Sequence, residues 1–218
     1  MLAAYTFNTQ YQQATTQDPQ LPNLRLLEGG KFVPDQFSPV LIHEDDRVSL
    51  RFFRWGMAPG WPRRIPATQI QRVAPAEYLF RHPDFRKPIL SSRCLIPADG
   101  YYVEQELAGK CRSFKVSGDP QFAFCFAGIF DSWTARDGSI QQAFSIITTP
   151  ASEQMRRFGL QMPLILNKQD ERVWLNPQAN LSRISQILYS PSRQALQVHP
   201  VEELKEHSLF GISDPIAA

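Results

Sequence analysis

The sequence predicts an α+β protein built around a twisted, barrel-like and mainly antiparallel β-sheet with short flanking helices. Segments with strand character outnumber those with helix character, and no strand–helix–strand rhythm repeats along the chain. The 18 prolines, spread over 218 residues, divide the chain into short elements and do not mark one linker. A chain of this length holds one sizeable core, so we expect a single domain over residues 1–218.

The strands are predicted from the alternation of apolar and polar residues. Alternation indicates strands over 47–54, 112–117 and 141–148, and the aromatic-rich apolar run 121–130 is typical of a buried strand. The Gln-rich segment 8–25 is polar, and we expect it to be irregular or a short helix.

Short helices are expected between the strands. The first, 74–81, should end before Pro83, because a proline disfavours helical geometry in the residue that precedes it. Proline is compatible with a first helical turn, which favours a second helix after Pro150. This second helix and two others are expected over 151–158, 170–175 and 181–188.

The composition is that of an ordinary globular protein and excludes several classes. The net charge of +2 lacks the strongly basic character of many nucleic-acid-binding domains, although a small basic cleft fits within this total. Cys94, Cys111 and Cys125 form no Cys-x-x-Cys pair and make no ligand cluster with the four histidines, so we expect reduced thiols, no metal and no cofactor. A signal-peptide pattern and a long apolar run are both absent, and we expect a cytoplasmic protein without membrane contact.

Five short motifs follow one another along the chain. They are Arg-Trp-Gly-Met-Ala-Pro at 54–59, Pro-Asp-Phe-Arg at 83–86, Arg-Cys-Leu-Ile-Pro-Ala-Asp-Gly-Tyr-Tyr at 93–102, Phe-Cys-Phe-Ala-Gly-Ile-Phe-Asp-Ser-Trp at 124–133 and Met-Pro-Leu-Ile-Leu at 162–166. In this order and spacing they resemble the SRAP family of abasic-site processing proteins (SOS response-associated peptidases) over most of the chain. The resemblance implies a single domain with a twisted β-sheet core and a positively charged channel for single-stranded DNA.

The resemblance also implies a covalent chemistry. Members of the family carry a cysteine after the initiator Met, and its amine and thiol capture the aldehyde of an abasic site as a Schiff base and then as a thiazolidine. A nearby Asn, Glu and His position the sugar and move protons. At the matching positions this sequence has Leu2, Lys31, Val103 and Gly159, so we expect that none of the family's catalytic positions is intact.

The DNA contacts implied by the resemblance are also changed. Three expected phosphate-binding arginines are replaced by Ala4, Pro75 and Gln161, whereas Arg86 and Arg93 remain. Trp61, shortly after the first motif, either stacks on a base or packs on the sheet rim. Arg63 and Arg64 either line a channel or belong to the solvated surface. The candidate DNA-binding residues are Pro34, Trp61, Arg63, Arg64, Glu77 and Arg86.

Three functions are compatible with these substitutions. The favoured one is a divergent SRAP-fold protein without covalent crosslinking activity, which retains at most weak, non-covalent binding of single-stranded DNA or of a partner. A second is residual abasic-site sensing or lyase activity that uses the amine of Lys31 or the α-amine of Met1, since an amine alone can form a Schiff base. A third is an accessory protein that binds a protein or small ligand in the former channel, made more apolar by Leu2, Val103 and Gly159.

Overall fold

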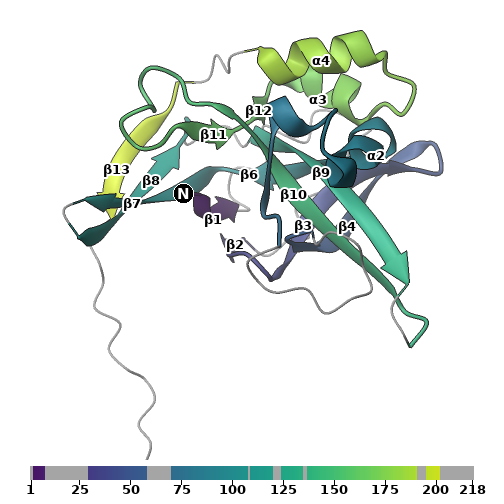
Figure 1. The fold of residues 1–218 in the computed structure, drawn as a ribbon, viewed down its shortest axis with the longest axis horizontal. Coiled ribbons are helices and arrows are strands. Elements are labelled where there is room, and N and C mark those ends of the chain that lie inside the picture. Colours follow the sequence, from purple (N-terminus) through teal and green to yellow (C-terminus); the bar gives the residue numbers. More distant parts are fainter. Residues whose placement is uncertain are drawn as a thin grey trace, which may run out of the picture.

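The computed structural model describes residues 2–7, 29–57, 70–107, 109–119, 124–134, 137–190 and 195–201. The Gln-rich segment 8–25 and the start of the expected strand 121–130 lie outside these residues. Two sheets and three α-helices are formed by the described part of the chain, and Figure 1 shows the helices on one side of the barrel and strands β7, β8 and β13 on the other.

The larger sheet closes into a barrel. Strand β10 pairs in parallel with β4, and the remaining contacts, β4 with β3, β3 with β6, β6 with β9 and β9 with β10, are antiparallel. Short strands extend it, because β5 and β11 pair with β10 and β12 pairs with β9. The strands span Phe37–Glu44 (β3), Arg47–Trp55 (β4), Val73–Pro75 (β5), Arg93–Ala98 (β6), Phe124–Thr134 (β9), Ile140–Pro150 (β10), Gln161–Pro163 (β11) and Ile165–Leu166 (β12).

The smaller sheet is antiparallel, with the strand order β13-β8-β7-β1-β2. Its strands span Leu2–Phe7 (β1), Gly30–Phe32 (β2), Gly100–Leu107 (β7), Lys110–Ser117 (β8) and Gln197–Val201 (β13). The predicted α+β class with a barrel-like, mainly antiparallel sheet is confirmed, and so are the strands expected at 47–54, 112–117 and 141–148.

The helices are α2 (Pro83–Ser91), α3 (Lys168–Leu175) and α4 (Leu181–Tyr189), with one 3-10 turn, η4 (Ala76–Tyr78). Asn167 and Asn180 begin α3 and α4 by accepting a backbone N–H inside the first turn, which satisfies a donor that has no partner within the helix. The helices predicted at 170–175 and 181–188 are confirmed; α3 begins two residues earlier than expected, and α4 ends one residue later.

Two expected helices are wrong, and one helix was not expected. The segment 74–81 is the short strand β5 followed by η4, and 151–158 consists of turns that bury Met155 and Phe158. The unexpected helix is α2, which begins at Pro83. His82 before it is extended, as expected for a residue ahead of proline, and its Nδ1 accepts from the backbone N–H of Asp84 as the helix N-cap.

The barrel strands carry two hydrophobic clusters on opposite faces, because successive side chains of a strand alternate. In β6, Leu95 packs in the first cluster, which includes Trp174 of α3, whereas Cys94 and Ile96 pack in the second. The second cluster also contains Tyr5 of β1 and other residues of the smaller sheet. The helices thus cover one face of the barrel strands, and the smaller sheet shares a core with the other face.

Arg93, the first residue of β6, joins the barrel to two helix ends. Its side chain is buried, and its guanidinium donates to the backbone oxygens of Ile89 and Leu90 in α2, at 2.9 and 3.0 Å. It also donates to the oxygens of Trp174 and Asn176 at the end of α3, both at 2.7 Å. The last carbonyls of a helix lack partners within the helix and carry partial negative charge, so one cation caps both ends.

This arrangement corrects one expectation from the sequence. The family resemblance implies that Arg93 contacts a phosphate, but its guanidinium is buried and donates its hydrogen bonds to helix carbonyls. Among the described residues, no helix is both long enough and apolar enough to cross a membrane.

We predict that Arg93→Met lowers the free energy of unfolding by about 3–5 kcal/mol, because it leaves buried carbonyls without a donor. Urea denaturation followed by circular dichroism measures the change. Arg86→Met removes the same charge from an exposed position of α2 and should change stability by no more than about 0.5 kcal/mol. Equal effects of the two substitutions would contradict the capping role.

Candidate functional site

Leu2 and Val103 face each other across β1 and β7. They are direct partners in the antiparallel register, and a β-bulge between Leu2 and Ala4 shifts the pairing. Further along, Tyr5 pairs with Tyr101, so the bulge brings Leu2 onto the same face as these buried rings. Val103 is buried in the second hydrophobic cluster, and Leu2 is partly buried and packs against it. Two of the positions named from the sequence therefore lie together, in apolar surroundings.

Gly159 is adjacent in sequence to a residue of the same cluster. It follows Phe158, whose ring lies 4.9 Å from the ring of Phe114, and Phe114 is the register partner of Val103. A Cβ atom on Gly159 would lie 3.7 Å from the nearest atom, the backbone oxygen of Gln161, which is an ordinary contact distance. Steric constraints therefore do not require glycine at this position.

Lys31 lies elsewhere in the smaller sheet. It pairs with Thr6, at the opposite end of β1 from Leu2, and its Nζ lies 4.5 Å from the centre of the Tyr102 ring. Tyr102 precedes Val103 in β7 and so points to the opposite face of the sheet. Lys31 therefore makes a cation–π contact on the outer face and is not brought together with Leu2 and Val103.

The candidate DNA-binding residues are only partly described. Glu77, in η4, accepts a hydrogen bond of 3.0 Å from the side chain of Gln161, a position where the resemblance implies an arginine. The Gln161 side chain also accepts from the Thr148 hydroxyl. Arg86 is exposed on α2, and Pro34 is half-buried in the turn after β2. The remaining three candidates, Trp61, Arg63 and Arg64, lie outside the described residues.

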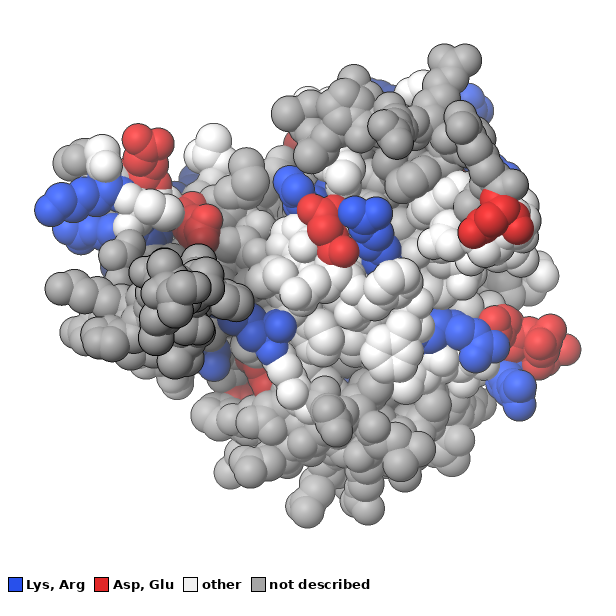
Figure 2. Space-filling model, turned by 90° about the horizontal axis from the view of Figure 1, so that it is seen from below, with Lys and Arg blue, Asp and Glu red and all other residues white. Residues whose placement is uncertain are grey.

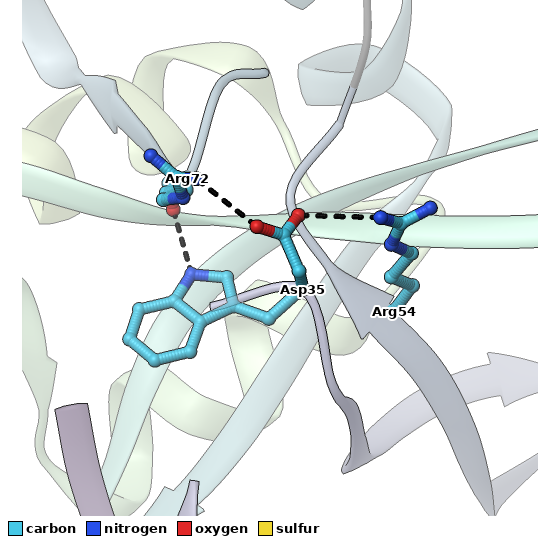
Figure 3. A network of polar contacts seen from close by, with 4 residues as sticks. Asp35, Arg54 and Arg72 are labelled. Carbon is cyan, nitrogen blue, oxygen red and sulfur yellow. Dashed lines mark hydrogen bonds and ion pairs between the residues drawn. The ribbon is translucent and has the colours of Figure 1, made fainter. Parts of the chain in front are cut away.

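A charged network that no sequence motif predicts lies beside Pro34. The carboxylate of Asp35 accepts from Arg72 at 3.0 Å and from Arg54 at 3.4 Å, and Figure 3 shows it between the two guanidinium groups. The three residues are far apart in sequence, so no local pattern joins them, although Arg54 begins the first of the five motifs. All three side chains are partly exposed, at 35–40% of their surface.

Backbone contacts hold this network in place. Asp35 has a positive φ of 71°, which is uncommon for a residue with a side chain, and its backbone N–H donates to the oxygen of Trp55 at 2.8 Å. The Trp55 indole donates to the backbone oxygen of Arg72, also at 2.8 Å. Gly56, which follows Trp55, has a φ of 132° that favours glycine, and a Cβ there would lie 2.6 Å from the side chain of Ile70.

Charge on the surrounding surface is mixed. Figure 2 shows one face on which Lys and Arg side chains are interspersed with Asp and Glu side chains around uncharged surface, so neither sign dominates its described part. A continuous basic channel is not visible in that part of the face. Electrostatic binding of DNA there would depend on a few local groups.

The buried cysteines do not provide a nucleophile. Burial raises the pKa of the Cys94 thiol and of the Cys125 thiol well above their usual range, so both remain protonated. Cys111 is exposed on β8. Within the described ranges, no group of three or more His, Cys, Asp or Glu side chains comes together as a metal site.

Solved bacterial proteins share this architecture of a closed barrel with a flanking antiparallel sheet. A protein from Bacteroides thetaiotaomicron superposes with a TM-score of 0.66 at 28% sequence identity, covering 78% of this chain and 75% of that one. A phage-related protein from Bordetella bronchiseptica superposes with a TM-score of 0.71 at 21% identity, covering 93% and 94%.

The family follows from the sequence comparisons. The family model described as SOS response associated peptidase (SRAP) matches residues 4–206, and the chain belongs to the SRAP family. It is 34% identical over 145 residues to the abasic site processing protein YoqW of Bacillus subtilis, a match that covers 66% of this chain and 65% of YoqW. It is 25% identical over 208 residues to the abasic site processing protein HMCES of Gallus gallus, covering 80% of this chain and 59% of HMCES. The chain thus spans less than two thirds of the length of these relatives.

We predict that a carboxylate introduced at position 103 destabilises the folded protein, because the position is buried among apolar side chains. In Val103→Glu, the apolar cluster should raise the pKa of the new carboxyl in the folded state. The folded state then binds its proton more tightly than the unfolded state does. Stability should therefore fall as pH rises from about 4.3 to the raised pKa, by about 1.4 kcal/mol for each pH unit, and stay low above it.

Val103→Gln, with a similar shape but no charge, is the matched control and should show no such dependence. Denaturation midpoints of both variants at pH 4 and pH 8 make the comparison. Equal denaturation midpoints of the two variants at pH 8 would contradict the prediction. They would mean that position 103 is solvated well enough to hold an ionised acid.

Proposed function

We propose that this SRAP-family protein binds single-stranded DNA without forming a covalent bond to abasic sites. The observation that carries the proposal is the pairing of Leu2 with Val103, of which Val103 is buried in an apolar cluster and Leu2 packs against it. The resemblance places a thiol nucleophile and a carboxyl at these two positions. A Leu and a Val supply neither a group that adds to an aldehyde nor one that transfers a proton.

The link to abasic-site DNA comes from the relatives. YoqW and HMCES are named as abasic site processing proteins, and membership of their family supports DNA as the ligand of this chain. We extend the proposal to a single domain over residues 1–218, because the family match spans 4–206. The non-covalent mode rests on the substituted positions Leu2, Val103 and Gly159.

An amine-dependent reaction has less support. Lys31 is exposed on the face opposite to Val103 and contacts the Tyr102 ring, so its amine is not enclosed with the other family positions. A Schiff base formed there would be reversible and would lack the thiol that closes a thiazolidine. Lyase activity is therefore the alternative outcome when the protein is incubated with abasic DNA.

We predict that the protein retards a single-stranded oligonucleotide with one abasic site on a native gel, but leaves no slow band on a denaturing gel. YoqW serves as the comparison protein in parallel lanes. A slow band with this chain under native incubation conditions would refute the non-covalent mode.

The same reactions, repeated with borohydride, separate the amine-dependent alternative. Borohydride reduces a Schiff base to a stable amine, so an adduct that is lost in Lys31→Ala would assign a lyase-like role to Lys31. An oligonucleotide of the same sequence without the abasic site is the control. If neither the abasic nor the intact oligonucleotide is retarded on the native gel, DNA binding itself is refuted.

A further inference from the structure

Two aromatic side chains lie exposed on the outer surface of strands β3 and β4. Phe37 is 60% exposed and Phe52 is 55% exposed. Phe37 is the register partner of Arg54, and Phe52 is two residues before Arg54 in β4. Because residues two apart on a strand share a face, the two rings and Arg54 lie together on one face of the sheet.

This face borders the charged network around Asp35. Arg54 shares the carboxylate of Asp35 with Arg72, so two positive charges are balanced by one negative charge. All three side chains are partly exposed, and the carboxylate fixes the two guanidinium groups in direction. The face therefore combines two open rings with a net positive charge.

We propose that Phe37, Phe52, Arg54 and Arg72 form a contact surface for a single nucleic-acid strand. Bases stack on the two rings, and backbone phosphates lie against the two arginines. This inference rests on the proposed function for its ligand, but it assigns the binding to residues outside the family's catalytic and DNA-contact positions. It also supplies positive charge that Ala4, Pro75 and Gln161 do not provide.

The combination of groups favours a single strand over other ligands. Open rings beside arginines provide both interactions that sequence-independent single-strand binding uses, namely base stacking and phosphate neutralisation. In a duplex the base faces are stacked on one another within the helix and cannot contact the rings. An acidic protein segment would satisfy the arginines but would leave the paired exposed rings without a role.

Fluorescence anisotropy with a labelled oligothymidylate at several salt concentrations tests the surface. Phe52→Ala is expected to raise the dissociation constant by about fivefold or more, the effect of losing one stacked base. Arg72→Gln is expected to weaken binding and to lower the slope of log affinity against log salt by about 0.7, the value for one phosphate contact on a single strand. Phe37→Ala is a second test of stacking, and unchanged melting curves verify that each variant is folded.

Two variants give matched controls. Arg51→Gln removes the same charge from the same strand, but Arg51 points to the other face of β4 and pairs with Glu44, so binding should stay within about twofold of the wild type. Asp35→Asn keeps a residue that tolerates positive φ and removes the shared negative charge. It should tighten binding and steepen the salt slope, which a purely structural role of Asp35 would not produce.

A second oligomer separates stacking from charge. An oligomer of sugar-phosphate units without bases keeps the phosphates, so Arg72→Gln should weaken its binding whereas Phe52→Ala should not. If the wild type binds oligothymidylate and both variants bind it equally well, this contact surface is overturned while the proposed function stands. If the wild type binds no single strand at all, both are overturned.

Discussion

The ends of α2 and α3 meet at one buried cation, the guanidinium of Arg93. Helix ends that are buried away from solvent need protein donors for their last carbonyls. The two helices pack on β6 and β9 and supply much of the first hydrophobic cluster. The placement of the helices on the barrel, and with it the burial of Trp174, therefore depends on a residue that begins the central strand β6.

Strand alternation distributes the apolar residues between two cores. Neighbouring residues of β6 and β9 serve opposite clusters, so the barrel is covered by helices on one face and shares a core with the smaller sheet on the other. The bulge in β1 modifies this rule locally, because it places Leu2 on the core face with Tyr5. A thiol at position 2 would occupy the same place, so the chemical character of the position is decided by the side chain and not by the backbone.

Much of the fold could be predicted from the sequence, because alternation is a local signal that survives in the tertiary structure. Helix α2 shows the limit: Pro83 reads as the stop of a preceding helix, yet it begins α2, with the extended His82 as its cap. In 151–158 the apolar residues are buried by turns, so composition alone misleads. The proximity of Leu2 and Val103, and the network around Asp35, depend on register and on contacts between distant segments, which no local pattern encodes.

The role of Arg93 also explains how a recognisable motif can persist beside an altered site. The block 93–102 contributes a helix-capping arginine, a core strand and the start of β7, all of which the fold requires whatever reaction the protein performs. At position 103, one residue later, the resemblance implies a carboxyl, and this chain has a valine that packs in the apolar cluster. Under the proposed function, such a protein keeps its architecture although it forms no covalent bond to abasic sites. In that proposal, binding comes from stacking and from a small excess of positive charge, and binding of this kind weakens as the salt concentration rises.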